Sequence, residues 1–425
     1  MMNKRLFIVG ASILQLPAIK AAKRMGLTVA VADYDPGAVG IPYADCYYNV
    51  STVDEAGICA AAEDFQSDGI ITLATDMPMR SVGYTCQKLG LCGIDYETAL
   101  RATDKGEMIK AFCRAGLACP KYYLPEVGEN AAELRGKLDY PLVCKPTDNS
   151  GSRGVVLVQS EDELDAAMRH STENSRSHRV ILEEYLVGSE ISVEIAVWDG
   201  EASVLAVTDK QTTGAPQFVE IGHSQPSRHP SETVEKIKKL AIDAVKAVGI
   251  DMGTAHVEIM VTEHGPVLIE LGARMGGDCI TTHLVPYSCG IDMIKANIDI
   301  ALGNRPNVSA THSRGAAIRF VMPPNGIISE ISGVHEAECV SGVRAVEIMK
   351  QVGDIAHGVE NSSDRLGFVI AQADTADEAL SICQKAAALI TATVRTEGEA
   401  LRAESFPIDI QQNKQEIYKN AKERS

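Results

Sequence analysis

Apolar runs that alternate with amphipathic segments mark the first hundred residues. The runs at 6–9 (LFIV), 27–33 (LTVAVAD) and 69–76 (GIITLATD) are typical of buried strands. Helical patterns follow the first run to about residue 25 and the third run to about residue 89. Because strands that alternate with helices form a parallel sheet covered on both faces, residues 1–103 are predicted to form a parallel α/β domain.

The middle of the chain, residues 104–307, predicts a second domain. It opens on a helix with Asp104 as N-cap and Glu107 as its reciprocal partner. A small α/β unit then extends from about 120 to 187 and would form a separate subdomain. Its predicted strands lie near 141–145, 155–158 and 180–184, around a helix at 161–170; beyond it the pattern predicts a strand at 190–197, a helix at 231–248, a hairpin at 254–272 and a helix near 288–302.

After RPN (305–307) the pattern changes again. Strands are predicted for GAAIRFVM (315–322) and VRAVEIMK (343–350), and a last strand and helix for residues 368–389. A polar tail follows residue 410. Residues 308–425 therefore predict a mixed α/β C-terminal domain, and the fold class is α/β and α+β.

Charge and composition exclude several classes of function. The formal net charge of −17 repels a phosphate backbone, so nucleic acid is not an expected partner. No stretch has the roughly 20 apolar residues of a membrane helix. The eleven cysteines are scattered without a CxxC pair, which favours reduced thiols in a cytoplasmic protein. The turn GASILQ (10–15) lacks the glycines of a dinucleotide fingerprint, so Asp33 at the end of the second strand does not by itself predict an NAD site.

A hairpin predicts two facing carboxylates. If residues 263–265 of HVEIMVTEHGPVLIELGAR form a three-residue loop, Glu258 stands directly opposite Glu270. Facing side chains have Cβ atoms about 4.5 to 5.5 Å apart, and like charges so placed need a cation between them. Two carboxylates suit Mg²⁺, which completes its shell with water and phosphate oxygens. Alternation places Arg274 on the same face. The alternative is an exposed hairpin whose acids face water.

The loop KPTDNSGSRGV (145–155) predicts a phosphate contact. Lys145 ends a strand, and the small residues from Ser150 to Gly154 permit backbone amides to approach a phosphate. The segment is not a P-loop, because GxxxxGK[ST] is absent. A flexible polar hairpin is the alternative for this motif by itself.

Five ordered segments resemble the ATP-grasp superfamily. They are DK (104–105), YPLVCKP with its Ser-Gly-Ser-Arg-Gly loop (140–154), ILEEYLVGSEISVE (181–194), FVEIGHSQPS (218–227), and HVEIM followed by IELGARMGGD (256–278). The order and spacing are similar to those of carboxylate-amine ligases of L-amino acid ligase type, of biotin carboxylase and of purine-pathway enzymes. The resemblance implies a Rossmann-like first domain, an ATP-grasp domain with a lid and a C-terminal domain, and it extends to about residue 400.

Residue roles follow from this resemblance. ATP and Mg²⁺ (or Mn²⁺) are the implied cofactors, with Glu258 and Glu270 as metal ligands. The catalytic residues would be Arg274, which stabilises an oxyanion, and His223, which contacts an acyl phosphate or is satisfied by backbone. Asp278 is a candidate for a substrate amine, and Arg319 and Asp364 are weaker candidates. The implied nucleotide-binding residues are Lys105, Lys145, Ser152, Gly154, Glu183, Glu184, Tyr185, Leu186 and Glu190.

One position departs from the family pattern. The family commonly reads Glu-x-Asn-x-Arg where this chain has Glu270, Leu271, Gly272, Ala273 and Arg274. The amide that helps to hold a second metal ion is therefore missing, which leaves the number of bound metal ions open.

The implied activity is an ATP-dependent ligase that forms an acyl phosphate from a carboxylate and condenses it with an amine or amino acid. The alternative with the same nucleotide site is a carboxylase or formyl-phosphate enzyme of the biotin or purine type. A nicotinamide-dependent oxidoreductase and a non-catalytic nucleotide sensor are the alternatives from other classes. The expected partners are small-molecule substrates, and the resemblance is compatible with a homodimer.

Overall fold

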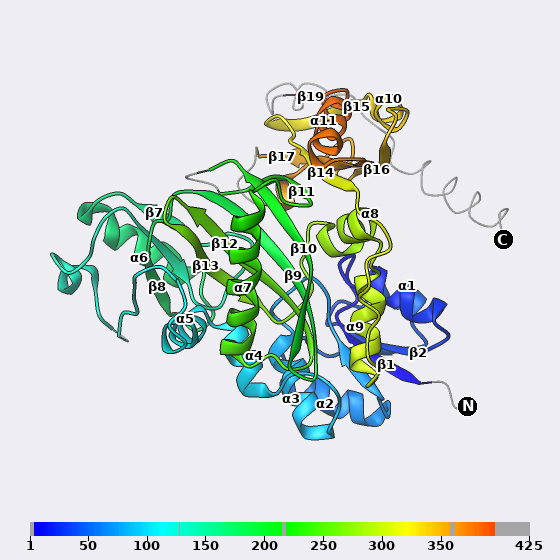
Figure 1. Cartoon of the computed structure of the whole chain (residues 1–425), viewed down its shortest axis with the longest axis horizontal. Coiled ribbons are helices and arrows are strands. Elements are labelled where there is room, and N and C mark those ends of the chain that lie inside the picture. Colours follow the sequence, from blue (N-terminus) through cyan, green and yellow to red (C-terminus); the bar gives the residue numbers. More distant parts are fainter. Residues whose placement is uncertain (1–3, 127, 215–217, 358–361, 396–425) are drawn as a thin grey trace, which may run out of the picture.

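The computed structural model describes residues 4–126, 128–214, 218–357 and 362–395, and the predicted polar tail lies outside these ranges (Figure 1). The first unit contains a four-stranded parallel sheet of order β3-β2-β1-β4, which confirms the predicted parallel α/β unit. The sequence did not reveal β3, which has too few residues to show a period, nor α2 and α4. The elements are β1 (Arg5–Val9), α1 (Leu16–Arg24), β2 (Thr28–Ala32), η1 (Ile41–Tyr43), β3 (Cys46–Tyr48), α2 (Glu55–Asp64), β4 (Gly69–Ile71), α3 (Met79–Leu89) and α4 (Tyr96–Thr103).

The helix α5 (Lys105–Arg114) leads into the small subdomain predicted near 120–187. Asp104 caps α5 by accepting a hydrogen bond from the amide of Glu107, as predicted. The side chain of Glu107 pairs with Lys110 at 2.8 Å, so the reciprocal capping bond was wrongly predicted. The subdomain has an antiparallel sheet of order β5-β8-β6-β7. Its elements are β5 (Tyr122–Tyr123), η2 (Ala131–Leu134), β6 (Leu142–Pro146), β7 (Val156–Val158), η3 (Glu161–Glu163), α6 (Leu164–Glu173) and β8 (Val180–Glu184).

A small core holds this subdomain together. Leu134 and Leu164 are fully buried there and pack with Leu142, Val158 and Leu182. In Figure 1 the subdomain extends away from the central sheet at the left. Its core is separate from the other buried clusters, and this is the arrangement expected if the subdomain acts as the predicted lid.

Truncation of this core provides a test. We expect Leu164→Ala to destabilise the lid by about 2–5 kcal/mol, because the leucine is fully buried and leaves a cavity. Hydrogen exchange measured by mass spectrometry should show lost protection in β6 and β8. Val187→Ala, at a position that is 73% exposed, serves as the control and should leave exchange unchanged. Equal loss of protection throughout the chain would show that the lid does not open separately.

An eight-stranded sheet forms the centre of the molecule, in the order β13-β12-β9-β10-β11-β14-β18-β16. The helix α7 (Ser231–Val248) occupies the predicted range and ends at Gly249, whose φ of 94° suits only a residue without a Cβ. The sheet continues across residue 307, because β11 pairs with β14. Its strands are β9 (Ser189–Trp198), β10 (Glu201–Thr212), β11 (Glu220–Gln225), β12 (Gly253–Thr262), β13 (Gly265–Gly272), β14 (Gly315–Val321), β16 (Val343–Ile348) and β18 (Gly367–Ala373).

The remaining elements complete the C-terminal part and the connection to it. A three-stranded sheet of order β17-β15-β19 adjoins α10 and α11, at the top of Figure 1. The elements are η4 (Ile280–Leu284), α8 (Val285–Cys289), α9 (Met293–Ala301), β15 (Gly326–Ser332), α10 (Val334–Glu338), β17 (Ile355–Ala356), η5 (Ser362–Asp364), α11 (Ala376–Ala387) and β19 (Thr391–Arg395).

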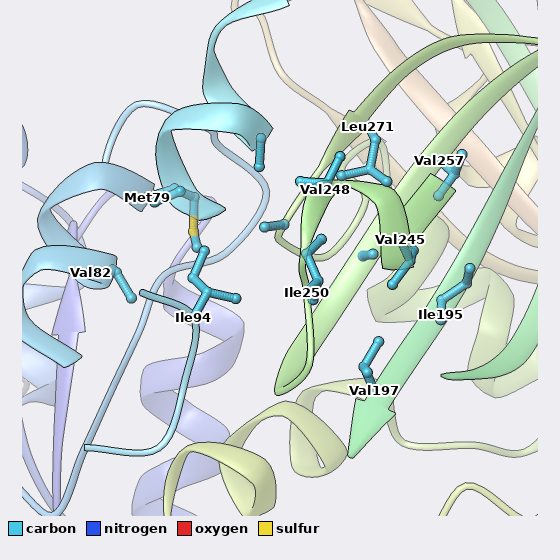
Figure 2. Close-up of a cluster of buried hydrophobic side chains, with 14 of the residues drawn as sticks. Met79, Val82, Ile94, Ile195, Val197, Val245, Val248, Ile250, Val257 and Leu271 are labelled. Atoms are coloured by element: carbon cyan, nitrogen blue, oxygen red, sulfur yellow. The ribbon is translucent and has the colours of Figure 1, made fainter. Parts of the chain in front are cut away.

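One buried cluster joins the first unit to the central sheet. Figure 2 shows Met79 and Val82 of α3 and Ile94 facing Val248 and Ile250 at the end of α7. Strand residues of the central sheet continue the same cluster. The first unit and the central sheet therefore share a core, which holds the edge of the parallel sheet at a constant position beside the central strands. Within the described ranges, no helix is long and apolar enough to cross a membrane.

Candidate active site

A cavity of about 950 Å³ lies where the lid, the central sheet and the first unit meet. Residues from all three parts and from the C-terminal strands line it. Gly154 does not line this cavity, because the space beside its Cα is filled by Asn174 and Pro146. Arg319 and Asp364, the weaker candidates, do not line it either. The other predicted site residues do: Lys105, Lys145, Ser152, Glu183, Glu184, Tyr185, Leu186, Glu190, His223, Glu258, Glu270, Arg274 and Asp278.

The two predicted carboxylates do stand opposite each other. Glu258 of β12 pairs with Glu270 of β13. The predicted three-residue loop was wrong, because Thr262 pairs with Gly265 across a two-residue turn. A β-bulge between Glu258 and Ile259 then shifts the register by one residue and brings the acids face to face. The pair was therefore predicted correctly although its turn was not.

Both predicted lysines face acids across the cavity. The Nζ of Lys105, the first residue of α5, lies 3.0 Å from Glu270 Oε2 and donates to the carbonyl of Asn149 at 2.8 Å. Burial lowers the pKa of Lys105, but Glu270 outweighs it and the pKa is raised. Lys145 lies 2.6 Å from Glu183, and both are buried. Lys105 thus remains protonated beside Glu270, and both lysines line the cavity.

A third lysine was missed by the sequence reading. The side chain of Lys210 on β10 is 3% exposed, and its Nζ lies 2.5 Å from Glu190 and 2.9 Å from Glu258, with Glu220 at 3.6 Å. Burial favours the neutral amine, yet the three carboxylates raise its pKa well above the ordinary value. The sequence left 201–212 unassigned, and only the pairing of β10 between β9 and β11 buries this cation. The available signal for the strand was the apolar run VLAV (204–207), which precedes Lys210.

The carboxylate of Glu258 is held by His256, which is itself held by Glu194. His256 donates from Nε2 to Glu258 at 3.1 Å and from Nδ1 to Glu194 at 2.6 Å. Burial opposes the imidazolium, but Glu194 and Glu258 raise the pKa of His256 to about 9. Burial also favours a neutral Glu258, whereas Lys210 and His256 lower its pKa well below the usual range. Glu258 is therefore an oriented anion at neutral pH.

The guanidinium of Arg274 is held by an acid from the first unit. Its Nε and Nη2 donate to the two carboxylate oxygens of Asp76, both at 2.9 Å. A Cβ at Gly272 would lie 2.7 Å from Asp76 Oδ1, so the Asp76 carboxylate lies against the face of Gly272 that carries no side chain. Asp76 follows β4, at the carboxyl end of a parallel strand where ligands bind in such sheets. Its place after a parallel strand could have identified Asp76 as a site residue, but Asp76 was not predicted from the sequence.

Asp76→Asn should lower kcat about tenfold while the KM for ATP stays within about twofold, because one ionic hydrogen bond that orients Arg274 is weakened. Initial rates of phosphate release over a range of ATP concentrations would measure this. Asp68→Asn in the first unit is the control. Asp68 accepts a hydrogen bond from the amide of Arg5, at the amino-terminal end of β1. A parallel rise in the KM for ATP would contradict a role confined to Arg274.

The candidates near the C-terminal strands form a second group. Asp278 accepts two hydrogen bonds from Arg365, at 2.8 and 3.0 Å, and lies 3.4 Å from His223 Nε2. Burial raises the pKa of Asp278, but His223 and Arg365 lower it below its usual range. The buried Arg365 stacks on Phe320 at 3.6 Å and was missed from the sequence. Arg319 binds Gln211 at 3.3 Å, and Asp364 lies in η5.

The adenine hinge was predicted at the end of β8. The amide of Glu184 donates to the carbonyl of Lys121 at 2.8 Å, and that of Tyr185 donates to Pro141 at 3.3 Å. The amides of Glu184 and Tyr185 therefore both donate to backbone carbonyl oxygens of the protein. The ring of Tyr185 lies 6.2 Å from that of Phe218, which closes the cavity beside the hinge.

The donor set fits a divalent ion that also binds phosphate. Among the described residues no cluster of three or more His, Cys, Asp or Glu side chains could hold a metal ion. Mg²⁺ needs only one or two protein carboxylates when phosphate oxygens and water complete its shell. Glu258 and Glu270 supply that number, and Lys105 and Lys210 already offset their charges from opposite sides.

Comparison with known proteins agrees with this geometry. Residues 138–282 match the ATP-grasp domain family, and residues 319–395 match the L-amino acid ligase C-terminal domain 2. The chain is 23% identical over 301 residues to the L-arginine-specific L-amino acid ligase of Bacillus subtilis, which covers 69% of this chain and 72% of the relative. It is 28% identical over 268 residues to the alanine–anticapsin ligase of Bacillus subtilis strain 168, covering 57% and 56% of the two chains.

Solved structures show the same fold. The L-amino acid ligase of Bacillus licheniformis superimposes with a TM-score of 0.80 at 23% identity, over 93% of this chain and 99% of that one. Phosphoribosylglycinamide synthetase from Anaerococcus prevotii gives a TM-score of 0.74 at 23% identity, over 92% and 100%. At such identities the likeness concerns the fold. The two domain matches show that the chain contains an ATP-grasp domain and an L-amino acid ligase C-terminal domain, and the relatives named above are ligases.

Proposed function

We propose that the protein activates a substrate carboxylate as an acyl phosphate and condenses it with an amine or amino acid, releasing ADP and phosphate. The observation that carries the proposal is the single cavity in which Glu258 and Glu270 face each other beside Lys105, Lys145 and Lys210. This arrangement can hold a triphosphate with a divalent ion and leaves its terminal phosphate next to Arg274.

Each charged residue has a role in the first step. A carboxylate oxygen of the substrate attacks the γ-phosphorus, and the bond from that phosphorus to the β-phosphate oxygen breaks. Lys105, Lys145 and Lys210 offset the negative charge that spreads over the transferred group. Glu258 and Glu270 would hold Mg²⁺, which neutralises phosphate charge when bound. The lid, closed over the cavity, excludes the water that would hydrolyse the acyl phosphate.

The second step is amide formation. The nitrogen of a neutral amine attacks the acyl carbon, phosphate leaves with the carbon–oxygen bond electrons, and the nitrogen loses one proton, which the departing phosphate can accept. Arg274, held by Asp76, can donate hydrogen bonds to the oxyanion of the tetrahedral intermediate and to the departing phosphate. No side-chain nucleophile is required.

Phosphate release with ATP and Mg²⁺ tests the proposal. The protein should be incubated with single amino acids and with pairs, and products should be identified by mass spectrometry. We expect ADP, phosphate and an amide whose mass is that of the two substrates less one water. Phosphate release that depends on bicarbonate alone would favour the carboxylase alternative and overturn the ligase proposal. Because the reaction consumes ATP and the eleven cysteines are all free, we also propose a cytoplasmic location.

A further inference from the structure

An apolar surface forms one side of the cavity. It consists of Ile13 and Leu14 from the connection between β1 and α1, of Pro17 in the first turn of α1, and of Leu73 and Ala74 after β4; these five residues are called the apolar wall. Ile13 is 63% exposed and Leu14 is 45% exposed. Large apolar side chains left accessible in a cavity are typical of a ligand-binding surface.

The apolar wall is held rigidly. The buried side chain of Gln15 accepts hydrogen bonds from the amide and hydroxyl of Ser12, at 3.2 and 2.7 Å, and donates to the carbonyl of Leu73 at 2.8 Å. Gln15 therefore joins the two segments that form the wall. Ile13 and Leu14 project from a loop that these hydrogen bonds hold together, and such preorganisation lowers the entropic cost of binding.

The apolar wall also lies at the reacting end of the cavity. Ala74 adopts a left-handed conformation with a φ of 56°, and a Cβ built on Gly277 would be 3.9 Å from the Ala74 side chain. Asp76, two residues further on, holds Arg274. Asp278 and Cys279 on the facing loop are left-handed as well. Such conformations in non-glycine residues concentrate at functional sites.

We propose that the apolar wall binds the apolar side chain of one amino-acid substrate, of the size of leucine, methionine or phenylalanine. This inference rests on the proposed ligase function and names a substrate class for it. The wall contains no charged side chain, so a charged substrate group placed there would lose its hydration without gaining a partner. The nearby acid Asp278 is already paired with Arg365. The apolar wall thus favours substrates whose side chain buries apolar surface against it.

The first measurement is the substrate profile of the unaltered protein. ATP-dependent amide formation should be compared for leucine, methionine and phenylalanine against serine, aspartate and lysine, each with a common panel of second amino acids. We expect kcat/KM to be at least tenfold higher for the apolar set, because such a side chain removes apolar surface from water when it binds against the wall. A preference for charged or polar amino acids would overturn the inference while leaving the ligase function standing. Absence of ADP formation with every amino acid would refute both.

The second measurement uses the double variant Ile13→Ser/Leu14→Ser. We expect the KM for leucine to rise about tenfold, while the KM for ATP and the kcat stay within about twofold. Tyr34→Ser is the matched control, since Tyr34 is an exposed apolar residue of the same unit that is 73% exposed and lies outside the cavity lining. An unchanged KM for leucine in the double variant would overturn the inference. A change of oligomeric state, measured by light scattering, without a change in KM would also overturn it. That result would identify the apolar wall as an interface between two copies of this chain.

Discussion

Replacing Glu270 with glutamine should lower ATP-dependent phosphate release by about two to three orders of magnitude, with the fold intact. The substitution keeps the size of the side chain and removes one of the two facing negative charges. A divalent ion would lose an anionic ligand, and Lys105 would lose the carboxylate that lies 3.0 Å from its ammonium. Losing one electrostatic contact to a transferring group commonly costs a factor of about 10² to 10³.

The measurement is phosphate release across a range of Mg²⁺ concentrations, with Mg²⁺ binding followed separately by calorimetry in the presence of ADP. Glu270→Gln should require more Mg²⁺ as well as turn over more slowly. Glu263→Gln is the matched control, because Glu263 lies in the turn of the same hairpin and its side chain is 85% exposed. Full activity in Glu270→Gln would remove the main support for the proposed function.

Lys210→Met is expected to impair both stability and activity. The lysine is 3% exposed and is the cation that three carboxylates share, so its removal leaves the partly buried Glu190, Glu258 and Glu220 repelling one another. Breaking a buried charge pair from one side costs about 3–5 kcal/mol. Phosphate release should fall at least a hundredfold, because Lys210 also offsets phosphate charge in the proposed mechanism.

Denaturant unfolding followed by circular dichroism would measure the change in the free energy of unfolding. Lys236→Met is the control, since Lys236 pairs with Glu232 on the exposed side of α7 and should change the free energy of unfolding by less than about 0.5 kcal/mol. A Lys210→Met protein as stable and as active as the parent would show that the carboxylates are satisfied in another way.

Local patterns predicted a large part of the fold. The range of the helix α7 was predicted correctly. Its long amphipathic period ends at Gly249, and the left-handed conformation at that position favours glycine. The parallel strands β1, β2 and β4 appeared as apolar runs. In contrast, β10 and β11 were not recognised. Polar and charged residues such as Lys210 and Glu220 interrupt their apolar pattern, and both strands are stable because neighbours pair with them on each side.

The same contrast between local patterns and contacts of distant segments applies to the residues of the candidate site. Glu258 and Glu270 lie on one hairpin, so strand alternation and pairing are enough to bring them together, and an error in the turn was offset by the bulge. Lys145 could be selected because it lies near the end of a strand, before a loop of small residues, and Lys105 was selected through the family resemblance. The contacts of Asp76 with Arg274 and of Arg365 with Asp278 join segments far apart in the chain.

The amino-acid sequence by itself determined the long amphipathic helices, the apolar strands of the first sheet and the facing carboxylates, since each depends on a repeat or a pairing within a short segment. Only the tertiary structure decided that Lys210 neutralises the acids, that Asp76 lies against Gly272 and holds Arg274, and that Ile13 and Leu14 line the cavity. These features arise from close packing between distant segments, where the available space and the neighbouring charges set the position of each side chain.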